Sequence, residues 1–382
     1  MTVDRDGGMT DPILQHAIAP ARVLRGPGAW IRSLPPLAQL TRRPMLLGRS
    51  AATARLRQRL LSDLRNHGIS GQPAQLLHDC CEVDLEALQR EAANQHSDAV
   101  IAVGGGKVLD AGKLLADRLG QPCITVPTSA ATCAGWTALA NVYSADGAFQ
   151  RDVALSRCPD LLVFDHRLVR QAPPRTLASG IADALAKWYE ASVSSGASGD
   201  GLVQQAVQMA RVLRDQLLLD AADALADADR IDAQPAEAWV RVVEACALTA
   251  GLIGGIGGAR CRTVAAHAVH NGLTQLAACH GSLHGEKVGF GILVQLRLEE
   301  LIGGSQLAAQ ARRQLLPLLQ ALALPCTLAD LGLAQASLDD LQSVCRFALA
   351  PESDLHHLPF RVNPDDLLAA LVSTTSGERL PA

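Results

Sequence analysis

Short apolar runs recur along the first 165 residues of the chain, each marked by a glycine or a proline. A strand that is covered on both faces of its sheet is apolar without interruption, so these runs predict buried parallel strands. Between the runs, apolar residues repeat at helical spacing over 53–67 and 84–96, which predicts amphipathic helices. The predicted strands are 44–48, 73–78, 98–104 and 121–127.

This alternation predicts a Rossmann-like α/β domain, with a mostly parallel sheet and helices on both of its faces. The segment 142–165 has a different pattern, because an Asp-Gly pair separates two alternating runs. Asp-Gly favours the tight turn of a hairpin. We therefore expect antiparallel strands to close this half of the chain.

The strand pattern ends near 165–174, and the remainder is rich in Ala and Leu at helical spacing. We expect an α/β domain over 1–165 and an all-α domain over 166–382. The length of 382 residues supports two domains, because single cores seldom grow beyond about 250–300 residues. A crevice between two such domains is where a ligand site is expected.

Composition narrows the class of protein. The net charge is −4 and no basic run occurs, which argues against nucleic acid or a membrane surface as a partner. The polar residues 1–12 lack a signal-peptide pattern, and the uncharged stretch 245–259 is too short and glycine-rich to span a bilayer. Ten cysteines without a C-x-x-C pair are typical of free thiols. We expect a cytoplasmic protein.

One strand, a three-glycine turn and a helix are predicted in succession over 98–119, with the turn formed by Gly104, Gly105 and Gly106. The amides of such a turn, together with the helix N-terminus, favour a pyrophosphate. For three glycines alone, a tight turn without a ligand is an equally good interpretation. The ligand interpretation gains support because the next strand ends, at the same edge of the sheet, in three hydroxyl residues: Thr128, Ser129 and Thr132.

Four of the eleven histidines lie within 267–291. His267 and His270 are three residues apart and share one face of a helix, whereas His284 follows a loop. Imidazoles from the two segments could converge on a divalent cation that takes a carboxylate as third ligand and keeps one position open. Asp183 is the candidate, because it has apolar neighbours and an unpaired buried carboxylate is costly. Taken singly, each histidine is better explained as an ordinary core or surface residue.

Four segments in order resemble the glycerol dehydrogenase branch of the iron-type alcohol dehydrogenase superfamily. They are GGGKVLDAGK (104–113), VPTSAATCAGWTALANVYSADGAF (126–149), APPRTLASGIADALAKWYEA (172–191) and AAHAVHNGLT with HGEKVGFG (265–291). The resemblance runs from about residue 18 to residue 362. It implies a dehydroquinate synthase-like architecture, in which a Rossmann-like domain binds a nicotinamide dinucleotide and a helical domain binds a divalent metal.

The resemblance also implies roles for individual residues. Asp183, His267 and His284 would bind the metal, and His270 would orient a ligand or take part in a proton path. The alcohol oxygen would bind the open metal position, and hydride would pass between the carbinol carbon and NAD(P). The cofactor would contact the glycine turn and the residues around it: Gly104, Gly105, Gly106, Lys107, Asp110, Thr128, Ser129 and Thr132.

Three departures from the family pattern refine these expectations. The iron-dependent branch has a histidine four residues after the aspartate, where this chain has Lys187, so we expect Zn²⁺ in preference to Fe²⁺. Cys133 replaces an aspartate that contacts glycerol and Trp136 follows it, so we expect the two to line a pocket that is poor for glycerol unless they merely pack in the core. Arg49 stands where an acidic residue often binds the ribose of NAD, so we expect NADPH to be slightly favoured.

The expected function is therefore a metal-dependent NAD(P)-linked oxidoreductase that acts on a small alcohol or its carbonyl, as a homo-oligomer. A glycerol-1-phosphate dehydrogenase, a dehydroquinate synthase-like lyase and a non-catalytic cofactor-binding relative are the alternatives. A lyase of that kind binds a phosphorylated substrate through several Lys and Arg residues at the site, and only Lys187 and Lys287 lie within four residues of the predicted metal ligands. A further metal site within 78–81 (His-Asp-Cys-Cys) is not expected, because that segment lies far from the predicted cation.

Overall fold

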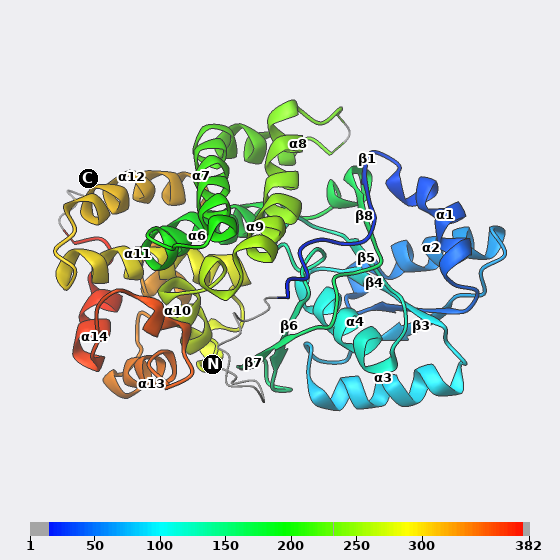
Figure 1. Cartoon of the computed structure of the whole chain (residues 1–382), viewed down its shortest axis with the longest axis horizontal. Helices are drawn as coiled ribbons and strands as arrows, with labels where there is room; N and C mark the ends of the chain where they lie inside the picture. The colour runs from blue at the N-terminus through cyan, green and yellow to red at the C-terminus, as the bar shows by residue number, and fades with distance from the viewer. Residues whose placement is uncertain (1–14, 232, 377–382) are drawn as a thin grey trace, which may run out of the picture.

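The computed structural model describes residues 15–231 and 233–376. The first 12 residues, for which no signal peptide is expected, lie outside this part of the chain. Figure 1 shows an α/β domain beside a domain made of helices. The last strand ends at Asp165, and within the described residues only helices and loops follow it.

The α/β domain is built on a parallel sheet of six strands in the order β1-β8-β5-β4-β2-β3. The four strands expected from the apolar runs are confirmed, with small shifts of their ends. The strands are β1 (Val23–Gly26), β2 (Pro44–Gly48), β3 (Gln72–Gln75), β4 (Ala99–Gly104), β5 (Cys123–Pro127) and β8 (Leu161–Asp165).

The expectation for 142–165 is correct for one part and wrong for the other. β6 (Leu139–Tyr143) and β7 (Phe149–Ala154) form the antiparallel hairpin around the Asp-Gly pair. β8 instead lies parallel between β1 and β5 in the main sheet. All five of its residues are buried, and such an uninterrupted buried run is typical of a parallel strand covered on both faces.

Helices cover both faces of the main sheet. Leu46 of β2 packs in one apolar cluster with residues of α1 (Ala29–Leu40) and α2 (Ala54–Asn66). Its neighbours Met45 and Leu47 face the opposite side, and they pack with residues of α3 (Glu82–Asn94) and α4 (Gly106–Leu119). Alternate side chains of a strand point to opposite faces, so one buried strand supplies both cores.

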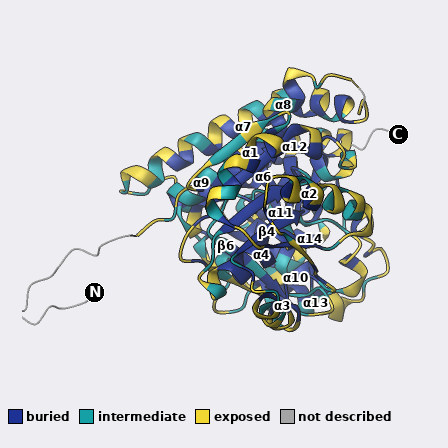
Figure 2. Ribbon diagram, turned by 90° about the vertical axis from the view of Figure 1, so that its right-hand side faces the viewer, coloured by how far each residue is buried: buried dark blue, intermediate teal, exposed yellow. Residues whose placement is uncertain are grey.

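The helical domain is arranged around α6 and α11, whose residues are largely buried (Figure 2). Its helices are α5 (His166–Val169), α6 (Pro174–Ser195), α7 (Gly201–Ala228), α8 (Glu237–Glu244), α9 (Ala250–Gly257), α10 (Ala265–Leu273), α11 (His284–Leu301), α12 (Gln306–Ala321), α13 (Leu338–Ala348) and α14 (Pro364–Val372). A π-helical turn (Ala245–Thr249) joins α8 to α9.

Two composition-based expectations can be compared with the structure. All ten cysteines are free thiols, as expected. Among the described residues, one helical stretch (Glu237–Gly257) is long and apolar enough to cross a membrane by length and composition. Of its most apolar 18 consecutive residues, 61% are buried inside the protein. A helix that is buried in a protein core can have the same length and apolar composition.

Candidate active site

A pocket of about 870 Å³ is lined by residues of both domains. The α/β domain contributes the carboxyl edge of its sheet, including the turn between β4 and α4. The helical domain contributes residues of α6, α10 and α11. A site at the carboxyl ends of parallel strands and between two domains is where open α/β sheets bind ligands.

The glycine turn brings backbone to the wall of this pocket. A Cβ on Gly104 would lie 2.7 Å from the Cβ of Val108, and one on Gly106 would lie 2.9 Å from Thr132 Oγ1. Side chains are thus excluded at these two positions. No side chain caps the N-terminus of α4 among the described residues, so its first amides are free to bind an anion. All three glycines and the hydroxyl residues Thr128, Ser129 and Thr132 line the pocket.

Two cationic side chains at this edge share one carboxylate. Arg49 Nη1 lies 2.6 Å from Asp79 Oδ1, and Lys107 Nζ contacts the second carboxylate oxygen. Arg49 and Lys107 line the pocket, whereas Asp79 lies behind them and is 7% exposed in its side chain. Asp79 therefore neutralises part of the positive charge that sequence reasoning assigned to Arg49.

Asp110 lines the pocket and is buried. One carboxylate oxygen lies 3.1 Å from Lys113 Nζ, and the other accepts a hydrogen bond from the backbone N–H of Asn141. Burial raises the pKa of Asp110, although Lys113 acts in the opposite direction. These contacts hold α4 against β6, so a structural role for Asp110 is evident beside its expected cofactor contact.

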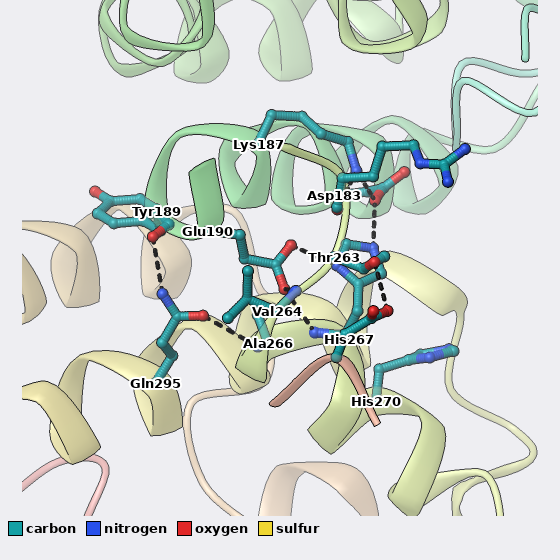
Figure 3. Close-up of polar contacts among 12 residues, drawn as sticks. Asp183, Lys187, Tyr189, Glu190, Thr263, Val264, Ala266, His267, His270 and Gln295 are labelled. Atoms are coloured by element: carbon teal, nitrogen blue, oxygen red, sulfur yellow. Dashed lines mark hydrogen bonds and ion pairs between the residues drawn. The ribbon is translucent and has the colours of Figure 1, made fainter. Parts of the chain in front are cut away.

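Asp183 of α6, His267 of α10 and His284 of α11 converge at the helical side of the pocket (Figure 3 labels the first two). Asp183 Oδ1 lies 3.4 Å from His267 Nε2 and 3.6 Å from His284 Nε2. One ligand atom from each residue lies within 4.8 Å of the other two. The residue types and spacing fit a divalent cation with two nitrogen ligands and one oxygen ligand.

The environment of Asp183 supports a bound cation. Its Oδ1 atom is buried and has no hydrogen-bond partner among the described residues. Burial opposes its ionisation, but Lys187 and the two histidines outweigh that effect and hold the pKa of Asp183 well below its usual value. A buried, ionised oxygen without a hydrogen bond is costly unless a cation satisfies it.

Glycines allow the three helices to approach each other closely. A Cβ on Gly285 would lie 1.8 Å from the carbonyl oxygen of Ser179 in α6, and one on Gly291 would lie 2.3 Å from the carbonyl oxygen of Ala266. The backbone N–H of Gly285 also donates to Ser179 Oγ. α11 can therefore contact both α6 and α10 through backbone, which brings the ligands together.

Glu190, which sequence reasoning missed, fixes the orientation of His267. Its Oε2 lies 2.6 Å from His267 Nδ1, and its Oε1 accepts backbone N–H groups of Val264 and His267 (Figure 3). Glu190 is completely buried. The available signal was its position seven residues after Asp183, since two helical turns place both side chains on one face of α6.

His270 has a different position from the three ligand candidates. Its ring centroid lies 4.2 Å from that of His284, and its Nδ1 lies 2.9 Å from Asn271 Oδ1. No hydrogen bond joins it to Asp183, His267 or His284 among the described residues. His270 therefore packs beside the candidate ligands, and Glu190 makes the orienting contact.

Only one of the two residues expected to line the substrate end of the pocket does so. Cys133 lines it, and burial raises the pKa of its thiol to about 11, so the thiol is neutral near pH 7. Trp136 lies outside the lining. Its indole packs where a Cβ on Gly251 would be, and its Nε1 donates to the carbonyl oxygen of Ile18. The expected substrate contact of Trp136 is thus replaced by a packing contact.

The segment at 78–81 forms part of a second group of possible ligands, since His78, Cys81 and Asp84 each place one ligand atom within 4.8 Å of the others. Here the carboxylate is already satisfied. Asp84 accepts hydrogen bonds from the backbone N–H groups of Leu77 and His78, and its other oxygen lies 2.8 Å from His78 Nδ1. These bonds explain the arrangement as a loop that Asp84 holds at the start of α3.

Comparisons with known proteins agree with this geometry. Residues 20–166 match the model of the iron-containing alcohol dehydrogenase family. An uncharacterised oxidoreductase of Synechocystis sp. is 52% identical over 97% of this chain and 94% of its own length. Hydroxycarboxylate dehydrogenase A of Escherichia coli K12 is 37% identical over 78% of this chain and 80% of its own. Glycerol dehydrogenase of Pseudomonas putida is 36% identical over 77% and 79%, respectively.

Among solved structures, a probable glycerol dehydrogenase of Sinorhizobium meliloti 1021 superposes with a TM-score of 0.82 and 28% identity, covering 93% of this chain and 97% of that one. The chain belongs to the iron-containing alcohol dehydrogenase family, in the branch of the glycerol dehydrogenases. It is therefore an NAD(P)-dependent oxidoreductase that acts on CH–OH groups. A nicotinamide dinucleotide and a divalent metal belong to this activity.

Proposed function

We propose that Asp183, His267 and His284 hold a single Zn²⁺ ion at the helical side of the pocket, and that the nicotinamide dinucleotide binds across the glycine turn. The observation that carries this proposal is the buried, unpartnered Oδ1 of Asp183 beside two imidazole Nε2 atoms. Two nitrogen ligands and one oxygen ligand with an open position suit catalytic zinc. Lys187 occupies the position of the fourth, histidine ligand of the iron-dependent branch.

Each side of the pocket has a separate task in this proposal. The amides of the glycine turn, with Thr128, Ser129 and Thr132, bind the cofactor diphosphate. Glu190 accepts the Nδ1 proton of His267 and so leaves Nε2 free as a ligand. When bound, the metal supplies a Lewis acid that favours loss of the proton from a hydroxyl or polarises a carbonyl. The walls formed by both domains limit the access of water to the nicotinamide.

The substrate is a small alcohol or its carbonyl, and we expect glycerol to be used poorly because Cys133 supplies no charged acceptor for a further hydroxyl. Two of the similar proteins, hydroxycarboxylate dehydrogenase A and glycerol dehydrogenase, are oxidoreductases by name, which supports this class over a lyase. A division of the chain at 165/166, a homo-oligomeric state and a cytoplasmic location are part of the proposal.

The test is a carbonyl panel with NADH and with NADPH, followed by the loss of absorbance at 340 nm. We expect protein reconstituted with Zn²⁺ to reduce at least one small aldehyde or ketone, and metal-stripped protein to be inactive. Fe²⁺ reconstitution is the control for metal identity. Full turnover by metal-stripped protein would contradict the need for a metal. Higher turnover with Fe²⁺ than with Zn²⁺ would contradict the assignment of zinc.

A further inference from the structure

Two cationic side chains of the helical domain line the metal end of the pocket, and the proposed mechanism uses neither. They are Lys187 of α6 and Arg262, which precedes α10. Asp183 and Cys133 line the same pocket. The glycine turn that binds the cofactor diphosphate belongs to the other domain, so these two cations are available for another anion.

Lys187 is buried and keeps donors free. Its Nζ donates to the carbonyl oxygen of Arg262 at 3.2 Å and lies 3.7 Å from Asp183 Oδ1. The second distance is an ion-pair distance and not a hydrogen bond, so two of its three N–H groups have no acceptor in the described part of the chain. Once Asp183 ligates a cation, its carboxylate also balances less of the charge of Lys187.

Arg262 has no partner for its guanidinium among the described residues. No carboxylate lies within 4 Å of it there, and its Nε is buried without a hydrogen-bond partner. The aliphatic carbons of Arg262 pack against Gly254 of α9, where a Cβ would lie only 2.7 Å from Arg262 Cγ. A guanidinium that is fixed at a pocket wall and lacks an acceptor is a ready partner for a carboxylate.

The nearby acidic groups do not supply that acceptor. Asp354 also lines the pocket, but one of its oxygens accepts a hydrogen bond from Thr263 Oγ1. Asp110 is paired with Lys113 in the α/β domain. Asp183 is assigned to the metal. Asp152 and Glu352 line the pocket as well, but neither forms an ion pair with Lys187 or Arg262 among the described residues, so both cations are available to an anionic substrate.

We propose that Lys187 and Arg262 bind the carboxylate of the substrate, and that this substrate is a 2-hydroxy acid or the corresponding 2-oxo acid. The inference rests on the proposed function, because it needs the metal at Asp183. Lys187 Nζ is only 3.7 Å from a metal-ligating oxygen. A carboxylate on the carbon next to the reacting one can reach it, whereas a phosphate ester would extend further.

The reaction is balanced with the cofactor of the established activity. Hydride leaves C4 of NAD(P)H and forms a C–H bond at C2 of the 2-oxo acid, while the carbonyl oxygen takes up one H⁺ from the solvent. The products are the 2-hydroxy acid and NAD(P)⁺. The carboxylate itself does not react, so its role is to orient C2.

The test compares 2-oxobutanoate with its neutral isostere 2-oxobutanamide in zinc-loaded protein. We expect the acid to be preferred in kcat/KM, and expect the acid-to-amide ratio to fall about ten- to a hundredfold in Arg262→Gln and in Lys187→Gln, mainly through KM. Arg260→Gln, an exposed arginine two residues away, is the matched control and should keep the native ratio. Metal content is measured in every variant.

Equal use of acid and amide, or a native-like ratio in Arg262→Gln, would overturn the inference. Preference for dihydroxyacetone phosphate over the acid would overturn the carboxylate assignment in favour of a phosphate.

Calorimetry with oxamate, an unreactive analogue of a 2-oxo acid, separates this inference from the proposed function. We expect oxamate to bind the complex of the protein with zinc and NADH, and expect Arg262→Gln to weaken this binding about tenfold or more. That result supports the subsite even if no carbonyl is turned over. Absence of oxamate binding overturns it.

Discussion

At the scale of single residues, the arrangement of the candidate metal ligands depends on the contacts around them. Glu190 is buried within the helical core, and its two oxygens bind the ring and the backbone of His267 and the backbone of Val264. One carboxylate thus holds both the start of α10 and the ring of His267, a candidate metal ligand.

We predict that Glu190→Gln lowers metal affinity about 10- to 100-fold, because an amide can no longer accept the Nδ1 proton with a full negative charge. Zn²⁺ titration against a competing chelator measures this loss. His270→Asn is the comparison, because His270 has no hydrogen bond to the three ligands among the described residues, and we expect a smaller effect. Native zinc affinity in Glu190→Gln would show that Glu190 only supports the backbone.

The second residue-scale prediction concerns the choice between NADH and NADPH. Arg49 stands at the pocket wall, where a 2′-phosphate would be attracted, and Asp79 holds it together with Lys107. We predict that the native protein uses NADPH at least as well as NADH. Asp79→Asn should raise the NADPH-to-NADH ratio of kcat/KM about three- to tenfold, because one full negative charge is removed beside both cations.

Arg49→Ala should lower the same ratio by a similar factor. Steady-state kinetics with both cofactors, at fixed ionic strength, measures these ratios. A ratio that neither variant changes would show that Arg49 and Asp79 form a surface ion pair outside the cofactor site.

The residues around the site differ in how far the sequence could identify them. Asp183, His267 and His284 could be named from the motifs and are brought together by the structure. Glu190 lies seven residues after Asp183 and so on the same face of a helix, but this spacing alone does not distinguish it from an ordinary core residue. Arg262 precedes a helix and has no spacing signal. Their roles follow only from three-dimensional contacts, namely the Nδ1 of His267 and the wall of the pocket.

At the scale of elements, α11 must approach α6 without side chains between them. Gly285 makes this possible at the first turn of α11, directly after His284. We predict that Gly285→Ala lowers the free energy of unfolding by about 1–3 kcal/mol or more, because its Cβ would meet the backbone of Ser179 at 1.8 Å. It should also reduce metal content by displacing His284.

Gly281→Ala is the matched control, because a Cβ there meets nothing within 4 Å and the position is exposed. Urea denaturation and metal analysis of both variants give the comparison. If Gly285→Ala were as stable as Gly281→Ala and kept its metal, the close approach of α6 and α11 would not be what positions His284.

Most elements of the α/β domain could be predicted, because their apolar runs are short and ended by Gly or Pro. β1 was missed because none of its four residues is fully buried, so its pattern is weak. β8 was expected in an antiparallel arrangement because it follows a correct hairpin signal. Nothing in local periodicity shows that the chain returns to the main sheet, since that pairing with β1 and β5 is long-range.

At the scale of the whole molecule, one partly buried acid away from the site links stability to pH. Burial raises the pKa of Glu299 in α11 to about 7, and a hydrogen bond from Gln295 Nε2 opposes this only in part. Between its usual value near 4.5 and about 7, the folded state holds a proton that the unfolded state has lost. The contribution of Glu299 to stability is therefore full below pH 4.5 and is lost as the pH rises through 7.

We predict that Glu299→Gln stabilises the protein at pH 8 relative to native protein and has little effect at pH 5. Denaturation curves at the two pH values measure the difference. The exposed Glu86 provides the control, and Glu86→Gln should give the same small change at both. An equal effect of Glu299→Gln at pH 5 and pH 8 would mean that Glu299 is not protonated in the folded state.

The two domains contribute different halves of one site, and the central claim is that the cation lies at Asp183, His267 and His284. A crystal of the zinc-loaded protein, measured on both sides of the zinc absorption edge, tests it directly. We predict one anomalous peak, about 2.0–2.2 Å from one carboxylate oxygen of Asp183 and from Nε2 of each histidine. A peak at His78, Cys81 and Asp84 with none at Asp183, or no peak in zinc-saturated protein, would contradict the account.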